Sequence, residues 1–328
     1  TRATSGNSQS VPFISLRNVS GSDEADEFFG DERDQAYTGN CELSRFSFGS
    51  LASLKSYVEN SYLYIPDSLI DVTGITAVKP KTMWRDLKKT SGQNRPVLYL
   101  HGYNMSFARS CKQAALFARN LDIEGRLLLF SWPSDGALLN YSRDEEDLQW
   151  SVFPLEAILN EMQTQFGPGG FDVVAHSLGG RGMVYALRQI AHRQAGKRPF
   201  LNQLILIAPD IDAGIFKQYL PSIRPLAANI SLYVSDNDKP LALSREVHGY
   251  PRLGETGKHL QGLKGVEVID VSDIGRRSFS GHLYHLYHER VIADLKTLLN
   301  SGQTAAKRTR LKKTGRQYWR LLPGNKEN

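Results

Sequence analysis

Residues 171–180 read Phe-Asp-Val-Val-Ala-His-Ser-Leu-Gly-Gly, and this stretch decides the fold class of the 328-residue chain. An apolar run ends just before Ser177, and residues 181–193 after it have the amphipathic spacing of a helix. A strand, a sharp turn around a serine and a helix are the setting in which a serine hydroxyl acts as a nucleophile. Such a turn needs small residues two positions before and after the serine, and Ala175 and Gly179 meet this demand. The stretch predicts Ser177 as a nucleophile, with a plain helix cap as the alternative.

Short apolar runs alternate with helix-length amphipathic segments from about residue 95 onward. The predicted strands are 96–100, 126–130, 171–175, 201–208, 229–234 and 266–271. The predicted helices are 107–121, 145–166, 181–193 and 283–299. Continuous apolar strands suit a parallel sheet that is buried on both faces. The alternation predicts an α/β protein with a doubly wound, mostly parallel sheet and helices on both faces.

The first of these strands is followed by His101 and Gly102, at a turn that can supply half of an oxyanion hole. Gly102 lets the chain turn, and the backbone N–H of Tyr103 would donate to the reacting oxygen. The second donor would be the N–H of Leu178. An ordinary strand-end turn is the alternative, but the position two strand–helix units before Ser177 favours the oxyanion hole.

Four residues near these turns are expected to contact a substrate. They are His101, Gly102, His176 and Trp132. For Trp132, which follows the strand 126–130, packing of an insertion onto the body is an equal alternative.

The acid that orients the base should follow Ser177 at the end of a later strand. Asp238 lies three residues after Ser235, where the strand 229–234 has just ended, and is the preferred acid. Asp236 is the near alternative. Asp210 and Asp212, after the strand 201–208, are the others, although either of these two is also suited to cap the next helix.

The base should come after the acid, in a loop beyond the last strand. His282 follows a glycine in that region and is the preferred base, whereas His285 and His288 are expected to have packing or surface roles. The chain order of Ser177, Asp238 and His282 is the order expected when a serine, an aspartate and a histidine form a catalytic triad of this kind. No carboxylate or cysteine cluster accompanies the histidines, so neither a metal nor a cofactor is expected.

Six short motifs occur in one order along residues 90–300. They are His-Gly-Tyr-Asn (101–104), Phe-Ser-Trp-Pro-Ser-Asp-Gly (130–136), Ala-His-Ser-Leu-Gly-Gly (175–180), Ala-Pro-Asp-Ile-Asp (208–212), Ser-Asp-Asn-Asp (235–238) and Gly-His-Leu-Tyr (281–284). The series resembles the esterase- and lipase-like α/β-hydrolases called domain of unknown function 900. The resemblance implies the α/β-hydrolase fold and supports Ser177, Asp238 and His282 position by position. It implies no particular substrate.

Composition divides the chain into four parts. Residues 1–40 are rich in Ser, Asn, Gly and acids and are expected to form a flexible leader. Residues 41–90 are expected to be an N-terminal elaboration, and 91–302 the catalytic domain. Residues 303–328 hold eight Lys or Arg and one acid in a chain of net charge +6, and are expected to form a basic tail. That tail is either simply solvated or a contact for an anionic surface, and no nucleic acid is expected at the core.

The sequence predicts an enzyme that cleaves a carboxylic ester or related acyl bond of a small or lipid-like substrate. The alternative is a catalytically silent hydrolase-fold protein used for binding or scaffolding, tethered through its tail. Of the two cysteines, Cys41 and Cys111, the second lies among apolar neighbours and is expected to be a buried free thiol. The sequence leaves the compartment open.

Overall fold

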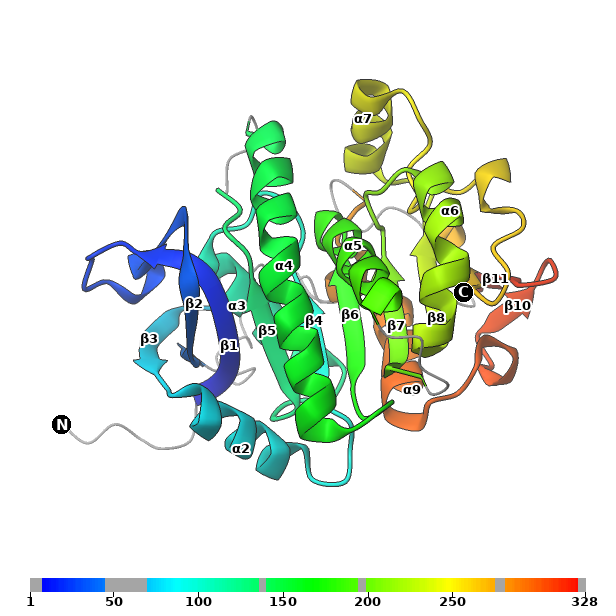
Figure 1. Ribbon diagram of the computed structural model, residues 1–328. Coiled ribbons are helices and arrows are strands. Elements are labelled where there is room, and N and C mark those ends of the chain that lie inside the picture. Colours follow the sequence, from blue (N-terminus) through cyan, green and yellow to red (C-terminus); the bar gives the residue numbers. More distant parts are fainter. Residues whose placement is uncertain (1–7, 45–69, 136–139, 194–198, 275–280, 324–328) are drawn as a thin grey trace, which may run out of the picture.

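One sheet of eleven strands organises the chain, which the computed structural model describes over residues 8–44, 70–135, 140–193, 199–274 and 281–323. The strand order is β10-β11-β9-β8-β7-β6-β4-β5-β1-β2-β3 (Figure 1). The strands are β1 (Ser8–Val19), β2 (Phe29–Ser44), β3 (Val72–Ala77), β4 (Val97–Leu100), β5 (Leu127–Ser131), β6 (Asp172–His176), β7 (Leu201–Ile207), β8 (Ala227–Val234), β9 (Glu267–Asp270), β10 (Leu311–Lys313) and β11 (Tyr318–Leu321).

Helices connect most of these strands. They are α2 (Pro80–Ser91), α3 (Phe107–Asn120), α4 (Tyr141–Phe166), α5 (Leu178–Arg193), α6 (Ala213–Ile223), α7 (Lys239–His248), α8 (Tyr284–Tyr287) and α9 (Glu289–Ser301). Single 3-10 turns are η1 (Ala25–Glu27), η4 (Arg224–Leu226), η5 (Lys258–Leu260), η6 (Ser272–Ile274) and η7 (Ala305–Lys307). None of the described helices is both long enough and apolar enough to cross a membrane.

The middle of the sheet is parallel, from β11 through β9, β8, β7, β6, β4 and β5 to β1. Antiparallel pairing adds β2 and β3 at one edge and β10 at the other. The chain first places β5 on one side of β4 and then places β6 on the other side. In α/β proteins, ligands bind at the carboxyl ends of the strands at such a switch point. Gly102 follows β4 and Ser177 follows β6, so both lie at the switch point.

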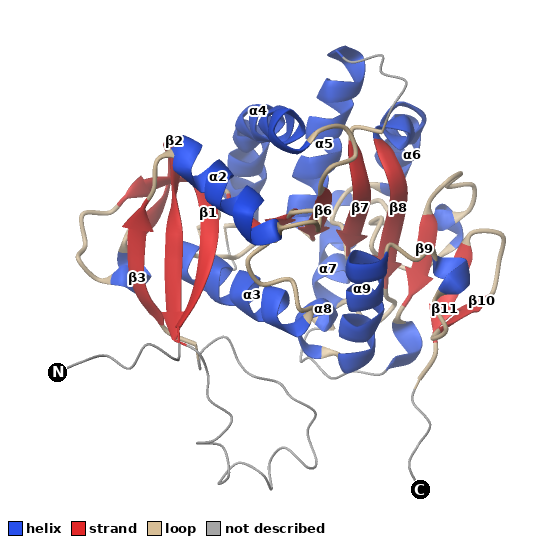
Figure 2. Ribbon diagram, turned by 90° about the horizontal axis from the view of Figure 1, so that it is seen from below, coloured by secondary structure: helices blue, strands red, loops and turns tan. Residues whose placement is uncertain are grey.

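Helices cover both faces of the sheet (Figure 2). Helices α2, α4, α5 and α6 pack into one hydrophobic core, and α3, α8 and α9 pack into the other. Successive residues of β4 alternate between them, because Leu98 and Leu100 face the first core and Val97 and Tyr99 face the second. This arrangement confirms the predicted doubly wound α/β architecture.

The six predicted strands correspond to β4 through β9, and three of the four predicted helices to α3, α4 and α5. The fourth, 283–299, is two helices in the structure. The chain is extended at His288, and the His288 side chain accepts a hydrogen bond from the backbone N–H of Arg290 (3.3 Å). His288 therefore separates the two helices, because α8 ends just before it and it is the N-cap of α9.

The predicted flexible leader, residues 1–40, is folded from residue 8 onward, because the structure places β1 and β2 within residues 8–44. These strands pair with each other, and β1 also pairs with β5 inside the sheet. Val11 and Phe13 are buried there. The acidic, glycine-containing stretch 21–27 forms only the connection between the two strands. Its composition concealed the strands on either side.

The segment 41–90, expected as an elaboration, supplies the end of β2 together with β3 and α2. Residues 45–69 of that segment, residues 1–7 of the expected leader and residues 324–328 of the expected tail lie outside the described residues.

Most of the predicted basic tail is also folded. Strand β11 pairs in parallel with β9, and β10 turns back along β11 as an edge strand. Trp319 and Leu321 are buried, and the buried Arg308 is paired with Asp294 (Nη1 to Oδ2, 2.6 Å). The alternation of buried and exposed residues in β11 is a strand pattern that the surrounding positive charges obscured.

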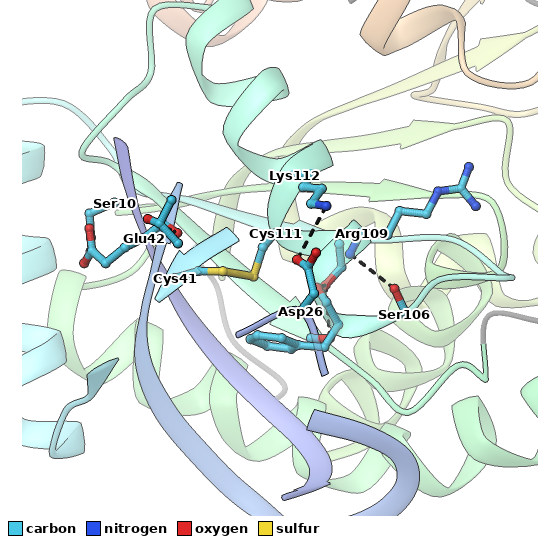
Figure 3. Close-up of a disulfide and its surroundings, with 12 residues drawn as sticks. Ser10, Asp26, Cys41, Glu42, Ser106, Arg109, Cys111 and Lys112 are labelled. Atoms are coloured by element: carbon cyan, nitrogen blue, oxygen red, sulfur yellow. Dashed lines mark hydrogen bonds and ion pairs between the residues drawn. A yellow bond between two sulfur atoms is a disulfide. The ribbon is translucent and has the colours of Figure 1, made fainter. Parts of the chain in front are cut away.

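The prediction for Cys111 was wrong, because its thiol is not free. Cys111 on α3 forms a disulfide with Cys41 on β2, with Cα atoms 6.4 Å apart (Figure 3). Both residues are fully buried. A sequence without a known register for β2 does not reveal which of its residues faces α3. The disulfide fastens the N-terminal hairpin to the helix that follows β4.

Removing this disulfide is expected to destabilise the fold. It joins residues 70 positions apart, and the loss of chain entropy in the unfolded state predicts a stabilisation of about 4 kcal/mol for a loop of that size. The double variant Cys41→Ala/Cys111→Ala should therefore unfold at a lower denaturant concentration than the oxidised wild type. Dithiothreitol should lower the wild-type midpoint and leave that of the double variant unchanged. Equal midpoints for the oxidised wild type and the double variant would contradict the prediction.

Candidate active site

Ser177 connects β6 to α5 in a backbone conformation that serine rarely adopts. Its φ is +52°, in the left-handed region, which costs a residue other than glycine or asparagine about 1–3 kcal/mol. Its N–H donates to the carbonyl of Ile207 (2.9 Å), and its own carbonyl accepts from the N–H groups of Gly180 (3.0 Å) and Asp210 (3.1 Å). A helix-capping serine has an extended backbone. The conformation of Ser177 therefore favours the strained turn over the simple cap.

Close contacts explain the small residues around this turn. A Cβ atom at Gly102 would lie 2.8 Å from His176 Nδ1 and 2.9 Å from the Cβ of Ser177. A Cβ at Gly179 would lie 2.4 Å from the carbonyl oxygen of His101. The turn after β4 and the turn after β6 thus touch through atoms that leave no room for a side chain.

His282 and Asp238 form a hydrogen-bonded pair at the carboxyl edge of the sheet. His282 Nδ1 donates to Asp238 Oδ2 (2.6 Å), and Asp238 Oδ1 accepts from the N–H of Leu241 in the first turn of α7 (3.0 Å). The carboxylate can only accept, so Nδ1 carries the proton and the lone pair of a neutral ring is on Nε2. This is the tautomer that a general base requires.

The charge of Asp238 governs the titration of His282. Burial by itself lowers the pKa of His282, but the carboxylate of Asp238 and its hydrogen bond outweigh this effect and raise the pKa above the ordinary value of 6.5. The Asp238 side chain is fully buried and that of His282 is 11% exposed. The pair therefore favours a positive charge on the imidazole at the moment when it has taken up a proton.

The other acid candidates are engaged elsewhere. Asp236 is exposed, and its N–H donates to the hydroxyl of Ser272 (3.0 Å). Asp212 is the N-cap of α6, where its Oδ1 accepts from the N–H groups of Gly214 (2.6 Å) and Ile215 (3.0 Å). Of the four carboxylates considered, Asp238 is the one whose hydrogen bond to His282 the structure describes.

Asp210 is the centre of a buried ion-pair network that sequence reasoning missed. Its Oδ1 accepts from Arg252 Nε (2.7 Å), its Oδ2 accepts from the Tyr141 hydroxyl, and Arg181 lies 3.6 Å away. Burial alone would raise the pKa of Asp210, but the charges of Arg181 and Arg252 lower it. The position of Arg181, one turn after Ser177, was the available signal. The network stabilises the turn at Ser177, because the backbone N–H of Asp210 donates a hydrogen bond to the carbonyl of Ser177.

His176 packs against His282, and its predicted contact with a substrate stays a prediction. Its ring packs against that of His282 with centroids 4.5 Å apart and against that of His285 at 4.3 Å. His176 Nε2 donates to the backbone carbonyl of His282 (3.2 Å). Burial, followed by the neighbouring imidazoles, lowers the pKa of His176 well below 6.5, so this ring is neutral. His176 therefore brings the loop of His282 against the residue that precedes Ser177.

His101 and Trp132 are buried and pack against each other. Their rings stack with centroids 5.1 Å apart, and Trp132 Nε1 donates to the carbonyl of His101 (3.0 Å). His101 Nδ1 contacts the carbonyl of Gly102 (2.8 Å), and burial lowers the pKa of His101 to about 3. Both residues were expected to contact a substrate. The contacts that the structure describes for them are packing contacts at the turn after β4, which for Trp132 was the alternative, and the predicted contacts with a substrate stay predictions.

The two predicted oxyanion-hole donors lie on the two turns that touch. Tyr103 follows Gly102, and its ring meets that of Tyr141 edge to face at 5.1 Å. Leu178 is the first residue of α5, where backbone N–H groups have no partner within the helix. The helix N-terminus also favours negative charge. In the described residues, His, Cys, Asp and Glu side chains form no group of three or more placed to hold a metal ion.

Several solved structures are similar to this chain at low sequence identity. Solved structures that match include an esterase from the hyperthermophilic archaeon Pyrobaculum calidifontis (14% identity, 64% of this chain and 78% of that chain, TM-score 0.40). Others are the product of gene lin2722 of Listeria innocua (13%, 70% and 99%, 0.41) and a cold-adapted esterase from an Arctic intertidal metagenomic library (13%, 63% and 83%, 0.36). No curated protein matches the chain.

A family model matches residues 76–301, from the end of β3 to the end of α9. Its description is α/β hydrolase of unknown function (DUF900). The match covers well over half of the chain and includes both turns and the His282–Asp238 pair. The chain therefore belongs to this family of α/β hydrolases.

Proposed function

We propose that the protein is a serine hydrolase that cleaves a carboxylic ester or a related acyl bond. Ser177 is the nucleophile, His282 the general base and Asp238 the residue that orients the base. The hydrogen bond from His282 Nδ1 to Asp238 carries the proposal, because it leaves Nε2 as the proton acceptor in a loop packed against His176. The left-handed conformation of Ser177 is the second support.

The proposed reaction proceeds through an acyl-enzyme. Nε2 of His282 takes the hydroxyl proton of Ser177 as the oxygen attacks the carbonyl carbon, and the carbonyl oxygen becomes negative. Backbone N–H groups of Tyr103 and Leu178 stabilise that oxyanion. The imidazolium then gives its proton to the leaving alcohol. A water molecule, deprotonated by His282, then attacks the acyl-enzyme. The imidazolium returns this proton to the Ser177 oxygen as the acid leaves.

The proposed substrate is a small or lipid-like acyl compound. Ser177 is only 4% exposed and His282 only 9%. A water-poor site of this kind strengthens the electrostatic contacts to the oxyanion. A site with so little exposed surface favours a substrate that presents a narrow acyl or alkyl group to Ser177.

A fluorophosphonate probe tests the nucleophile directly. The wild type should be labelled at Ser177, as located by peptide mass spectrometry, and should hydrolyse at least one p-nitrophenyl ester in a series of increasing acyl length. Ser177→Ala should abolish labelling and hydrolysis, whereas Ser222→Ala, at an exposed serine of α6, should leave both intact. Absence of labelling and hydrolysis in the folded wild type would refute the proposed function.

Asp238→Asn is expected to lower kcat/KM by roughly 10⁴, because a neutral partner holds the wrong tautomer of the base. It should also change the pH profile. The raised pKa of His282 makes activity fall as the pH drops through a value above 6.5, since the protonated ring is no base. Without the charge of Asp238 burial dominates, and the residual activity should persist to lower pH. Asp236→Asn, in the same loop, should match the wild type; a loss as large as that of Asp238→Asn would contradict the assignment.

Gly102→Ala is expected to lower kcat by about 10², because a displacement near 1 Å at reacting groups costs about that factor. The added methyl group would meet His176 and Ser177 at less than 3 Å, so the two turns must separate. Gly74→Ala is the control, since the added Cβ there is 4.0 Å from its nearest neighbour. Michaelis kinetics of both variants, with circular dichroism to verify folding, measure the effect. Wild-type kcat in Gly102→Ala would argue against the proposed contact of the turns.

A further inference from the structure

Hydrogen bonds join the turn after β4 to the segment at the end of β5. This segment, the loop of residues 131–135, contains the Ser-Trp-Pro-Ser motif, which the proposed reaction does not use. The Ser134 hydroxyl accepts from the N–H of Met105 (2.9 Å), and Trp132 Nε1 donates to the carbonyl of His101 (3.0 Å). Both ends of the turn that contains Tyr103 are therefore tied to this loop.

A buried carboxylate from α4 holds the same turn. Asp144 is 0% exposed, and its Oδ2 accepts from the N–H of Asn104 (3.1 Å) and from the Ser134 hydroxyl. Its Oδ1 accepts from the N–H of Asp135 (2.9 Å). Hydrogen bonds to an ionised acceptor are about twice as strong as neutral ones. Asn104 itself has a φ of +58°, in the left-handed region that asparagine tolerates, and the bond to its N–H fixes the peptide that joins it to Tyr103.

A buried guanidinium from β1 holds the turn on its other side. Arg17 is 0% exposed and donates four hydrogen bonds, each to an uncharged oxygen. The acceptors are the carbonyls of Met105 (2.6 Å), Ser134 (2.7 Å) and Gly30 (3.3 Å) and the hydroxyl of Ser131 (3.0 Å). Burial lowers the pKa of Arg17 to about 10, with nearby carboxylates, Asp144 first among them, acting against that effect, so the side chain stays charged at neutral pH.

We infer that Arg17 and Asp144 are positioning residues that hold the N–H of Tyr103 in place for oxyanion stabilisation. Asp144 binds the N–H of Asn104, which belongs to the peptide after that of the Tyr103 N–H, and Arg17 binds the carbonyl of Met105 two peptides further along, so two opposite charges from two elements hold the same turn. The inference rests on the proposed function. It assigns a role to both serines of the motif, because the Ser131 hydroxyl accepts from Arg17 and the Ser134 hydroxyl bonds to Asp144.

General stability alone would not require this arrangement. Buried charges can often be replaced by apolar side chains at little cost to stability. Here, however, three of the four hydrogen bonds of Arg17 and all three of Asp144 go to the turn or to the loop beneath it. Pre-positioned donors matter because they need no rearrangement as the negative charge develops.

Asp144→Asn tests the inference against a matched control, Asp294→Asn. Asp294 also forms a buried pair, with Arg308 at 2.6 Å and both side chains 1% exposed, but it contacts Tyr233 of β8 and not the turn after β4. Asp144→Asn should lower kcat about 10- to 100-fold with little change in KM, a fraction of the 10²–10³ that loss of a whole donor costs. Asp294→Asn should lower stability and leave the kcat of the folded enzyme unchanged. Arg17→Lys, which keeps the charge but loses the planar fork, should lower kcat in the same way.

Amide hydrogen exchange supplies a readout that needs no substrate. Exchange in the peptide containing Asn104 and Met105 should accelerate in Asp144→Asn and stay unchanged in Asp294→Asn. If Asp144→Asn does not fold, Ser134→Ala keeps both charges and should still lower kcat several-fold and speed the same exchange.

The outcomes separate the two levels of the argument. Equal loss of kcat in Asp144→Asn and Asp294→Asn, or wild-type kcat in Asp144→Asn, would overturn the positioning role while the wild type remains a labelled hydrolase. A folded wild type that takes up no fluorophosphonate and cleaves no ester would overturn the proposed function, and the positioning role would fall with it.

Discussion

The site depends on a contact between two backbone turns that leaves no room for side chains. The turn after β6 carries Ser177 at a positive φ, and the turn after β4 approaches it at Gly102, where an added Cβ would lie 2.9 Å from the Cβ of Ser177. These two strands are neighbours because the chain reverses its winding direction between β5 and β6. The winding of the sheet thus determines where Ser177 and the predicted oxyanion donors meet. The distance between the two turns then depends on Gly102 and Gly179, where a side chain would not fit.

A contact this close stays in place only if its surroundings are rigid, and buried polar groups supply much of that rigidity. Asp210 holds the carbonyl of Ser177, and its own carboxylate is held by Arg252 and Tyr141. The turn after β4 rests on side chains from β1, α4 and the loop after β5. Each buried charge in these networks meets several hydrogen-bonding partners, as a charge removed from water requires. The polar groups therefore lie beside the residues of these two turns that have a positive φ, Ser177 and Asn104.

The parts of the fold that the sequence predicted are those encoded by local patterns. Buried parallel strands appear as apolar runs, and the small residues around Ser177 follow from the geometry of one turn. Asp238 and His282 were found because their order along the chain and their place after strands are constrained. Contacts between distant segments left no such signal. The partner of Cys111 depends on which face of β2 meets α3, and the role of Arg17 depends on β1 lying beside β5.

Composition misled in two places for a related reason. Charged and glycine-rich residues were attributed to whole segments, although they belong to the connection between β1 and β2 and to the exposed side of β10 and β11. An edge strand that exposes lysines is protected against pairing with another chain, so positive charge near the C-terminus is compatible with a folded edge. Arg308 shows the difference most clearly, since it is counted among the basic residues of the tail yet is buried against Asp294.

The histidines around the base show how the site selects one protonation state. His176 and His285 lie within contact of each other, and burial lowers the pKa of both, that of His285 to about 3. The rings behind the base therefore stay neutral across the physiological range and bring no charge of their own. A proton taken up by His282 then meets one close compensating charge, the carboxylate of Asp238. Because these neighbouring rings are neutral, the carboxylate of Asp238 is the main influence that raises the pKa of His282.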